Sequence, residues 1–356
     1  MCFSSSALFK RGSVCALLAT SFFAPLILGS VSARAEQIVN IYSYRQPYLI
    51  NPLLEAFTKK TGIKTKIIFA KKGLIERIAA EGKLSLADVL LTVDIGRLTG
   101  AVDKGIVQPL SSQALTDNIP AQYRSGKNDW FGLTVRSRVI YASKERVKQD
   151  KITYEELADP KWRGKICVRS GQHVYNVAMI AAMIKHHGKE WTKNWLEGVK
   201  ANLARKPSGN DRAQVKAVFA GQCDLAIGNT YYMGKMQLND KKPEQKKWAD
   251  AVKILFPNSH TRGAHVNVSG MVLAKYAPHK ENAIKLMEFL VSDEAQKIYA
   301  EVNHEYPVKP GVDWSALVQS WGTFKPDPVS LDEIAKLRKA ASLLVDETDF
   351  NSGPSS

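Results

Sequence analysis

The sequence predicts an α/β fold, because short apolar strands alternate with amphipathic helices along most of the chain. A continuous apolar run at residues 87–93 is typical of a strand that is buried on both faces of a largely parallel sheet. The 356 residues exceed the length of an ordinary single domain and favour two. Hydrophobic residues make up 45% of the chain, which is enough to form a sizeable core.

The first 35 residues have the pattern of a secretory signal peptide. Lys10 and Arg11 form a positive start, an apolar run covers residues 14–28, and the sequence A-R-A at residues 33–35 matches a cleavage site. The alternative is a membrane anchor, but the apolar run is too short for a comfortable span. We therefore expect residues 1–35 to be removed and the mature protein to be soluble and outside the cytoplasm.

The first half of the remaining chain alternates strands and helices. Leu53, Leu54 and Phe57 fall on one face of a helical stretch that ends at Gly62. Apolar and polar side chains then alternate in the manner of a strand, and a long strand-rich segment follows further along the chain. We expect strands at residues 39–44, 63–69, 87–93 and 130–143, and helices at residues 47–60 and 74–81.

The second half continues the alternation without a tandem repeat or a low-complexity linker. We expect strands at residues 165–169, 223–228 and 266–274, and helices at residues 175–186, 189–203, 211–220, 280–291 and 331–344. Since no flexible tether separates the halves, we expect two lobes joined by strands that cross between them. The predicted boundaries are residues 36–136 and 264–316 for the first lobe, 137–263 for the second, and 317–356 for a C-terminal helical extension whose last residues, 351–356, form a frayed tail.

The four cysteines indicate whether the protein works in an oxidising compartment. Cys2 and Cys15 fall within the predicted signal peptide, and the residues before Cys15 do not fit a lipidation site. Cys167 and Cys223 remain, and an even pair in an oxidising compartment is a candidate disulfide. The alternative is two buried free thiols. A bridge would close a long loop and contribute about 4 kcal/mol in the chain-entropy model.

The charge of the chain does not indicate a nucleic-acid partner. The formal net charge is +16, and removal of the three positive charges in the first 35 residues leaves +13. The lysines are scattered, and basic residues do not interleave with aromatic ones as they do in proteins that bind single strands. We expect a monomer that binds no nucleic acid.

Catalytic patterns are missing from the sequence. It contains no phosphate-binding loop, no H-E-x-x-H, no G-x-S-x-G and no G-x-G-x-x-G. His186 and His187 are adjacent in a Lys-rich helix end, where their side chains point about 100° apart. We expect a solvated helix end there instead of a metal pair, and we expect no enzymatic activity.

Three tyrosines are the most informative polar residues. Tyr231 and Tyr232 are adjacent in a turn-rich loop, residues 228–234, which can bend so that neighbouring side chains converge. Tyr175 lies at the expected start of a helix, where the positive helix end can hold an anion. Tyr175 and Tyr231 each follow a cysteine of the pair by eight residues, so a disulfide would place both tyrosines at one end of the sheet.

Phenolate oxygens suit a hard, highly charged cation such as Fe(III). Three phenolates would neutralise the three charges of the ion. A bidentate anion held by arginine could supply the remaining oxygen ligands. From the residues alone, aromatic packing and stacking against a sugar remain the alternatives.

Seven segments between residues 39 and 311 resemble the periplasmic ferric-binding proteins of bacterial ABC importers. They are YSYRQPY (42–48), ADVLLTVD (87–94), WFGLTVRSR (130–138), CVRSG (167–171), GNTYY (228–232), HVNVSG (265–270) and EYPV (305–308). The resemblance implies a type II periplasmic-binding-protein-like fold, with two α/β lobes and the site in the cleft. It also implies that Tyr175, Tyr231 and Tyr232 are the iron ligands.

Some members of this family have a His or Tyr ligand from the first lobe near position 46, where this chain has Gln46. The subgroup it most resembles fills that gap with a carbonate-type anion. The resemblance makes Arg45, Gln46, Arg136 and Arg138 the expected anion partners, and Tyr48 a wall residue.

The resulting interpretation is periplasmic capture of ferric iron and its delivery to the permease and ATPase subunits of an ABC transporter. One alternative keeps the fold and binds a small anion through the cleft arginines. Another is a secreted hydrolase or transferase, but the sequence assembles no nucleophile and base.

Overall fold

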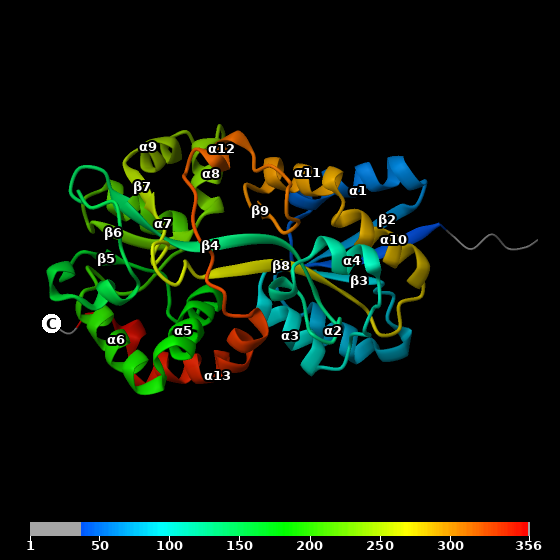
Figure 1. Ribbon diagram of the computed structural model, residues 1–356, viewed down its shortest axis with the longest axis horizontal. Helices are drawn as coiled ribbons and strands as arrows, with labels where there is room; N and C mark the ends of the chain where they lie inside the picture. The colour runs from blue at the N-terminus through cyan, green and yellow to red at the C-terminus, as the bar shows by residue number, and fades with distance from the viewer. Residues whose placement is uncertain (1–36, 355–356) are drawn as a thin grey trace, which may run out of the picture. The chain divides into compact units, whose positions relative to one another are not determined.

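A computed structural model describes residues 37–354, in which helices lie on both sides of one mixed β-sheet (Figure 1). The predicted signal peptide lies outside the described residues. The main path of the sheet runs in the order β2 (Lys64–Phe69), β1 (Ile38–Ser43), β3 (Val89–Thr92), β8 (Val266–Leu273), β4 (Phe131–Ser143), β6 (Leu225–Asn229) and β5 (Ile166–Cys167). Two further strands, β7 (Val252–Leu255) and β9 (Tyr306–Pro307), pair with β4.

The sheet is mixed, so the expectation of a largely parallel sheet was wrong. Strand β1 pairs with β2 and β3 in parallel, and β5 pairs with β6 in parallel. All pairings of β4 and β8 are antiparallel. A long apolar run shows that a strand is buried on both faces, but it carries no information about the direction of the neighbouring strand.

Strand β4 joins the two halves of the sheet. All of its 13 residues are buried. Its first part, as far as Ser137, pairs with β8, and its second part, from Arg138, pairs with β6 and β7. This is the arrangement expected of a strand that crosses from one lobe to the other (Figure 1).

Helix α1 (Pro47–Thr61) shows how local sequence sets the element bounds. Pro47 occupies the first helical turn, where its missing N–H costs nothing. Gly62 ends the helix with φ 74°, and its N–H donates to the Thr58 carbonyl at 2.8 Å. Leu53 and Phe57 are fully buried, as the periodicity predicted. The other helices around β1, β3 and β8 are α2 (Leu74–Glu81), α3 (Ile95–Asp103), α4 (Gln113–Asn118), α10 (Lys280–Leu290) and α11 (Asp293–Asn303).

The second set of helices surrounds β5, β6 and β7. It comprises α5 (Val174–His187), α6 (Lys189–Ala201), α7 (Asp211–Phe219), α8 (Tyr231–Gln237) and α9 (Glu244–Asp250). Helices α5, α6 and α7 lie close to their expected positions, whereas α8 and α9 were not expected. Within residues 37–354, no helix has the length and apolar character required to cross a membrane.

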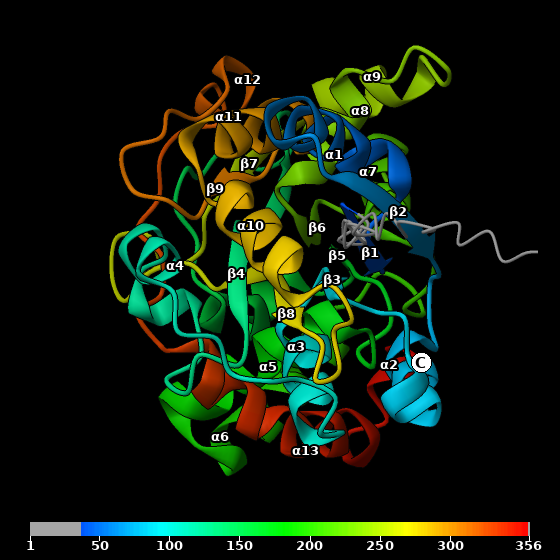
Figure 2. The ribbon, with the colours of Figure 1, turned by 90° about the vertical axis from the view of Figure 1, so that its right-hand side faces the viewer.

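The C-terminal extension is docked on the rest of the protein. After the short helix α12 (Ala316–Gln319), helix α13 (Leu331–Glu347) packs against both α5 and α3 (Figure 2). Phe350 is buried, and the Asn351 side-chain oxygen accepts a hydrogen bond from the Gly171 N–H at 2.8 Å. The expectation of a frayed tail was therefore wrong for residues 351–354, because α13 brings them against the loop before α5.

The histidine pair at the end of α5 was also misjudged. His186 Nε2 lies 2.7 Å from an Asp327 carboxylate oxygen, and His187 Nε2 lies 2.7 Å from a Glu155 carboxylate oxygen. The ring of His187 also stacks on Trp191. The two rings point to different partners, so they form no metal pair, but they are held by the fold instead of being solvated.

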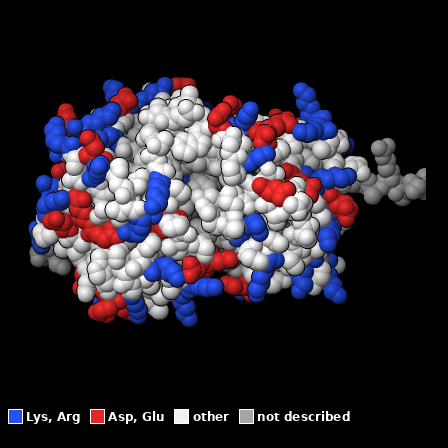
Figure 3. All heavy atoms as spheres, viewed as in Figure 1, with Lys and Arg blue, Asp and Glu red and all other residues white. Residues whose placement is uncertain are grey.

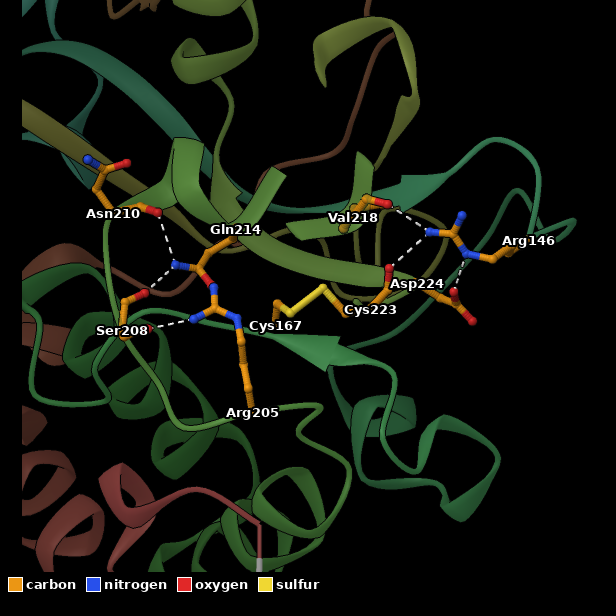
Figure 4. The surroundings of a disulfide bond; sticks show 9 residues. All are labelled: Arg146, Cys167, Arg205, Ser208, Asn210, Gln214, Val218, Cys223 and Asp224. Atoms are coloured by element: carbon orange, nitrogen blue, oxygen red, sulfur yellow. Dashed lines mark hydrogen bonds and ion pairs between the residues drawn. A yellow bond between two sulfur atoms is a disulfide. The ribbon is translucent and has the colours of Figure 1, made fainter. Parts of the chain in front are cut away.

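Cys167 and Cys223 form a disulfide with a Cα–Cα distance of 5.9 Å (Figure 4). It connects β5 to the turn before β6, and both sulfur-bearing residues are buried. Arg146 supports the same turn, because its guanidinium donates to the carbonyls of Val218 and Cys223 at 2.8 and 3.0 Å. The bridge fastens together the two parallel strands whose ends carry the candidate site.

We expect the double variant Cys167→Ser/Cys223→Ser to lower the free energy of unfolding by roughly 2–4 kcal/mol, since it releases a long loop in the unfolded chain. Urea unfolding of the wild type with and without reductant provides the comparison. Mass spectrometry of the unreduced mature protein should show two hydrogens fewer than the reduced protein. Equal masses would contradict the disulfide.

Candidate metal centre

The three tyrosines converge at the ends of neighbouring strands. Strand β5 leads into α5, in which Tyr175 is the second residue, and β6 leads into α8, which begins at Tyr231. Because β5 and β6 run in parallel, both helices start at the same end of the sheet. The Tyr231 hydroxyl donates to the Tyr175 hydroxyl at 3.1 Å, and the rings of Tyr231 and Tyr232 lie 4.4 Å apart.

Tyr231 and Tyr232 lie in the first turn of a helix, so the expectation of a turn-rich loop was wrong. The glycines on which that expectation depended serve close packing. A Cβ at Gly228 would lie 2.5 Å from the Tyr141 ring, and a Cβ at Gly234 would lie 2.7 Å from the His304 ring. Gly228 in β6 and Gly234 in α8 therefore allow close packing, and neither interrupts helix α8.

Burial makes the phenols of Tyr231 and Tyr232 harder to ionise. Burial first, and then the neighbouring Tyr175, raise the pKa of Tyr231 well above its usual value. The pKa of Tyr232 is raised by burial and by the carboxylate of Asp211. A cation that binds through these oxygens must therefore displace their protons.

Asp211, which is fully buried at the start of α7, connects several segments next to the tyrosines through its carboxylate. Its carboxylate accepts from Arg138 at 2.7 Å, from Arg169 at 2.9 Å and from the Asn229 N–H at 2.9 Å. Burial alone would raise the pKa of Asp211, but the guanidinium groups of Arg138 and Arg169 outweigh that effect. The pKa lies below its usual value, and the carboxylate is ionised. Arg138 also donates to the Asn176 side chain at 2.7 Å, which ties the start of α5 to the end of β6.

A second buried carboxylate, Glu305, binds two arginines that line the pocket. Arg45 donates to one of its oxygens at 2.9 Å, and Arg136 donates to the other at 2.8 Å. Both guanidinium groups also contact the Ser269 hydroxyl. Burial raises the pKa of Glu305, but the two arginines lower it to about 2.

These groups surround one pocket of about 150 Å³. It is lined by Tyr44, Arg45, Gln46, Leu49, Val93, Arg136, Tyr175, Tyr231, Tyr232, Lys235 and Glu305. Of the expected residues, Arg138 does not line the pocket, because its guanidinium is bound to Asp211, Asn229 and Asn176 beneath it. Tyr48 is 60% exposed and also lies outside the lining.

Sequence reasoning missed Lys235, Glu305 and Asp211. The spacing of four residues between Tyr231 and Lys235 could have indicated that they share a helix face, but α8 was not expected. Glu305 is distant from its arginines in the sequence and gave no local signal. Over the described part of the chain, no group of three or more His, Cys, Asp or Glu side chains could hold a metal ion.

Comparison with known proteins agrees with this architecture. Residues 85–321 match the family described as bacterial extracellular solute-binding proteins. The chain belongs to this family. Its fold is that of the type II periplasmic binding proteins, and the family is one of binding proteins and not of enzymes.

Three members of the family are particularly similar. Iron uptake protein A1 of Synechocystis is 46% identical over 88% of this chain and 88% of its own. The apo ferric ion-binding protein A of Pasteurella haemolytica is 55% identical, with a TM-score of 0.83 over 88% of this chain and 98% of its own. A Trichodesmium member solved in complex with iron and citrate ligands is 45% identical, with a TM-score of 0.85 over 88% and 99%.

Glu305 provides a pH test of the site scaffold. At neutral pH its ionised carboxylate stabilises the folded state, and this stabilisation is lost as the pH falls from about 4.5 to about 2. We expect Glu305→Gln to lower the free energy of unfolding at pH 7 by roughly 3 kcal/mol, because two buried arginines lose their counter-charge. The difference from the wild type should shrink below pH 4.5.

Denaturant unfolding at pH 7, 5 and 3 measures this difference. Glu294→Gln is the matched control, since Glu294 is half-exposed and pairs only with the exposed Lys60. A difference that stays constant from pH 7 to pH 3 would contradict the role of Glu305.

Proposed function

We propose that this protein captures ferric iron in the periplasm and delivers it to the permease and ATPase subunits of an ABC importer in the inner membrane. The convergence of Tyr175, Tyr231 and Tyr232 around one pocket carries the proposal. The similar proteins are named for iron uptake or ferric-ion binding, which supports the same cargo. The predicted signal peptide and the membership in an extracellular family support the periplasmic location.

The three phenolates neutralise the charge of Fe(III) and satisfy its preference for hard oxygen donors. Because the pKa values of Tyr231 and Tyr232 are raised, iron binding releases protons, and acidification weakens it. The protein itself performs no covalent step. Its residues bind the ion, orient the ligands and hold the positive groups that an anion needs.

A synergistic anion, carbonate or a similar oxygen donor, completes the coordination of the iron. Arg45, Gln46 and Arg136 line the pocket and are the proposed anion partners. Arg138 acts one layer below, where it supports the tyrosine-bearing helix α5 through Asn176. The Trichodesmium structure, which contains iron and citrate, shows that a similar protein can take a carboxylate anion with the metal.

The proposed cleft separates two lobes, for which we keep the boundaries inferred from the sequence, residues 36–136 with 264–316, and residues 137–263. Hinge motion in β4 and in the segment just before β8, where the chain passes from one proposed lobe to the other, would change their separation. Arg338, in the helix α13 of the proposed extension, reaches residues assigned to both lobes, because its Nη1 lies 3.3 Å from Asp94 and 3.4 Å from the Val174 carbonyl. A monomer suffices for this function.

The alternative, a binder of a small anion alone, is less well supported. Arg45 and Arg136 are already paired with Glu305, so the pair contributes one uncompensated charge and not two. Anion binding without a metal would also leave the three converging hydroxyls without a role.

Iron loading tests the proposal directly. The wild type should develop a visible tyrosinate-to-Fe(III) charge-transfer band with ferric citrate, and the double variant Tyr231→Phe/Tyr232→Phe should lose both the band and at least 100-fold in affinity, since two of three phenolates are gone. Tyr276→Phe, at an exposed tyrosine on another part of the surface, is the control. Ferric affinity retained in the double variant would overturn the ligand assignment.

A further inference from the structure

The pocket contains one cation, Lys235, that has no hydrogen-bond or ion-pair partner among the described residues. Lys235 lies one helical turn after Tyr231 on α8, and its Nζ atom lies 4.7 Å from the centroid of the Tyr231 ring and 5.8 Å from that of Tyr232. Among residues 37–354 it forms no ion pair and no side-chain hydrogen bond. The other charged groups that line the pocket, Arg45, Arg136 and Glu305, are bound to one another.

The surroundings of Lys235 disfavour its charge. Arg136 lines the same pocket, and its guanidinium carbon lies 5.8 Å from the centroid of the Tyr231 ring, beside which the Lys235 ammonium also lies. A sequestered cation without an acceptor costs free energy, so an acceptor supplied by a ligand would relieve that cost.

The charge balance of the loaded site shows what kind of ligand is required. Fe(III) and three phenolates sum to zero. Arg45 and Arg136 share Glu305 and keep one positive charge, and Lys235 on α8 adds a second. An anion with a single acidic group can bind either the Arg45 and Arg136 pair or Lys235, whereas a polycarboxylate can bind both.

We propose that Lys235 binds a carboxylate arm of a chelator that enters with the iron, and so makes the protein selective for ferric polycarboxylates over iron held with a carbonate-type anion alone. This inference rests on the proposed function. One carboxylate would lie at Arg45 and Arg136, and another at Lys235, while the metal bonds to the tyrosines. Lys235 would act as a specificity-determining residue of the cleft, and it would not bind the metal itself.

A competing explanation is that Lys235 only stabilises the phenolate of Tyr231 through its charge. That role would strengthen iron binding by the same factor whatever anion accompanies the metal. The dependence of the effect on the anion therefore separates the two explanations.

The test compares wild type, Lys235→Met and Lys235→Arg, each loaded with ferric citrate or with Fe(III) in bicarbonate as the only synergistic anion. Affinities come from competition with a chelator, read through the visible charge-transfer band. We expect Lys235→Met to weaken ferric citrate binding about tenfold, as for one lost charge-assisted hydrogen bond, and bicarbonate-supported binding less than threefold. Lys235→Arg should stay within threefold of the wild type for both.

Lys247→Met is the matched control, because Lys247 is an exposed lysine on the neighbouring helix α9 and its loss changes the net charge equally. An equal loss for both iron forms in Lys235→Met, or no loss for either, would overturn the proposal. If the wild type itself bound neither iron form, the proposed function would fail first, and that outcome is distinct from a failure at Lys235 alone.

Discussion

The buried carboxylate of Asp211 is the interaction on which the candidate site depends. It binds Arg138, Arg169 and the backbone N–H of Asn229, and so joins α7, β4, the loop before α5 and the end of β6. Removal of this carboxylate would leave two arginines without a counter-charge beneath the tyrosines. The disulfide joins the last residue of β5 to the turn before β6, so the strands that lead into the tyrosine-bearing helices are covalently linked.

Two charge clusters at the pocket are built on the same principle. In each cluster a buried carboxylate binds two arginines: Asp211 binds Arg138 and Arg169, and Glu305 binds Arg45 and Arg136. Each cluster has two arginines and one carboxylate, so its net charge is +1. The neutral phenols therefore lie in positively charged surroundings. Such a surrounding favours loss of the phenol protons when a cation arrives, and it favours an anion that arrives with that cation. Lys235 adds a further positive charge from α8.

Much of the fold could be predicted from the sequence, because it depends on local patterns. The apolar face and terminal glycine of α1, and the buried run of β3, lie where periodicity placed them. The direction of the central strands could not be predicted, since it depends on connections between distant segments. The residue type of the three tyrosines and the spacing of two of them from the cysteines drew attention to them, and the resemblance to ferric-binding proteins made them the expected iron ligands. Glu305 and Asp211 were missed because their partners are brought close only by the folded chain.

A crystal structure of the iron-loaded protein, with anomalous scattering measured at the iron edge, tests the central claim most directly. The account predicts one strong anomalous peak in the pocket, within bonding distance of the hydroxyl oxygens of Tyr175, Tyr231 and Tyr232. An iron peak elsewhere on the protein, or one in the pocket that is not bonded to these three oxygens, would contradict it.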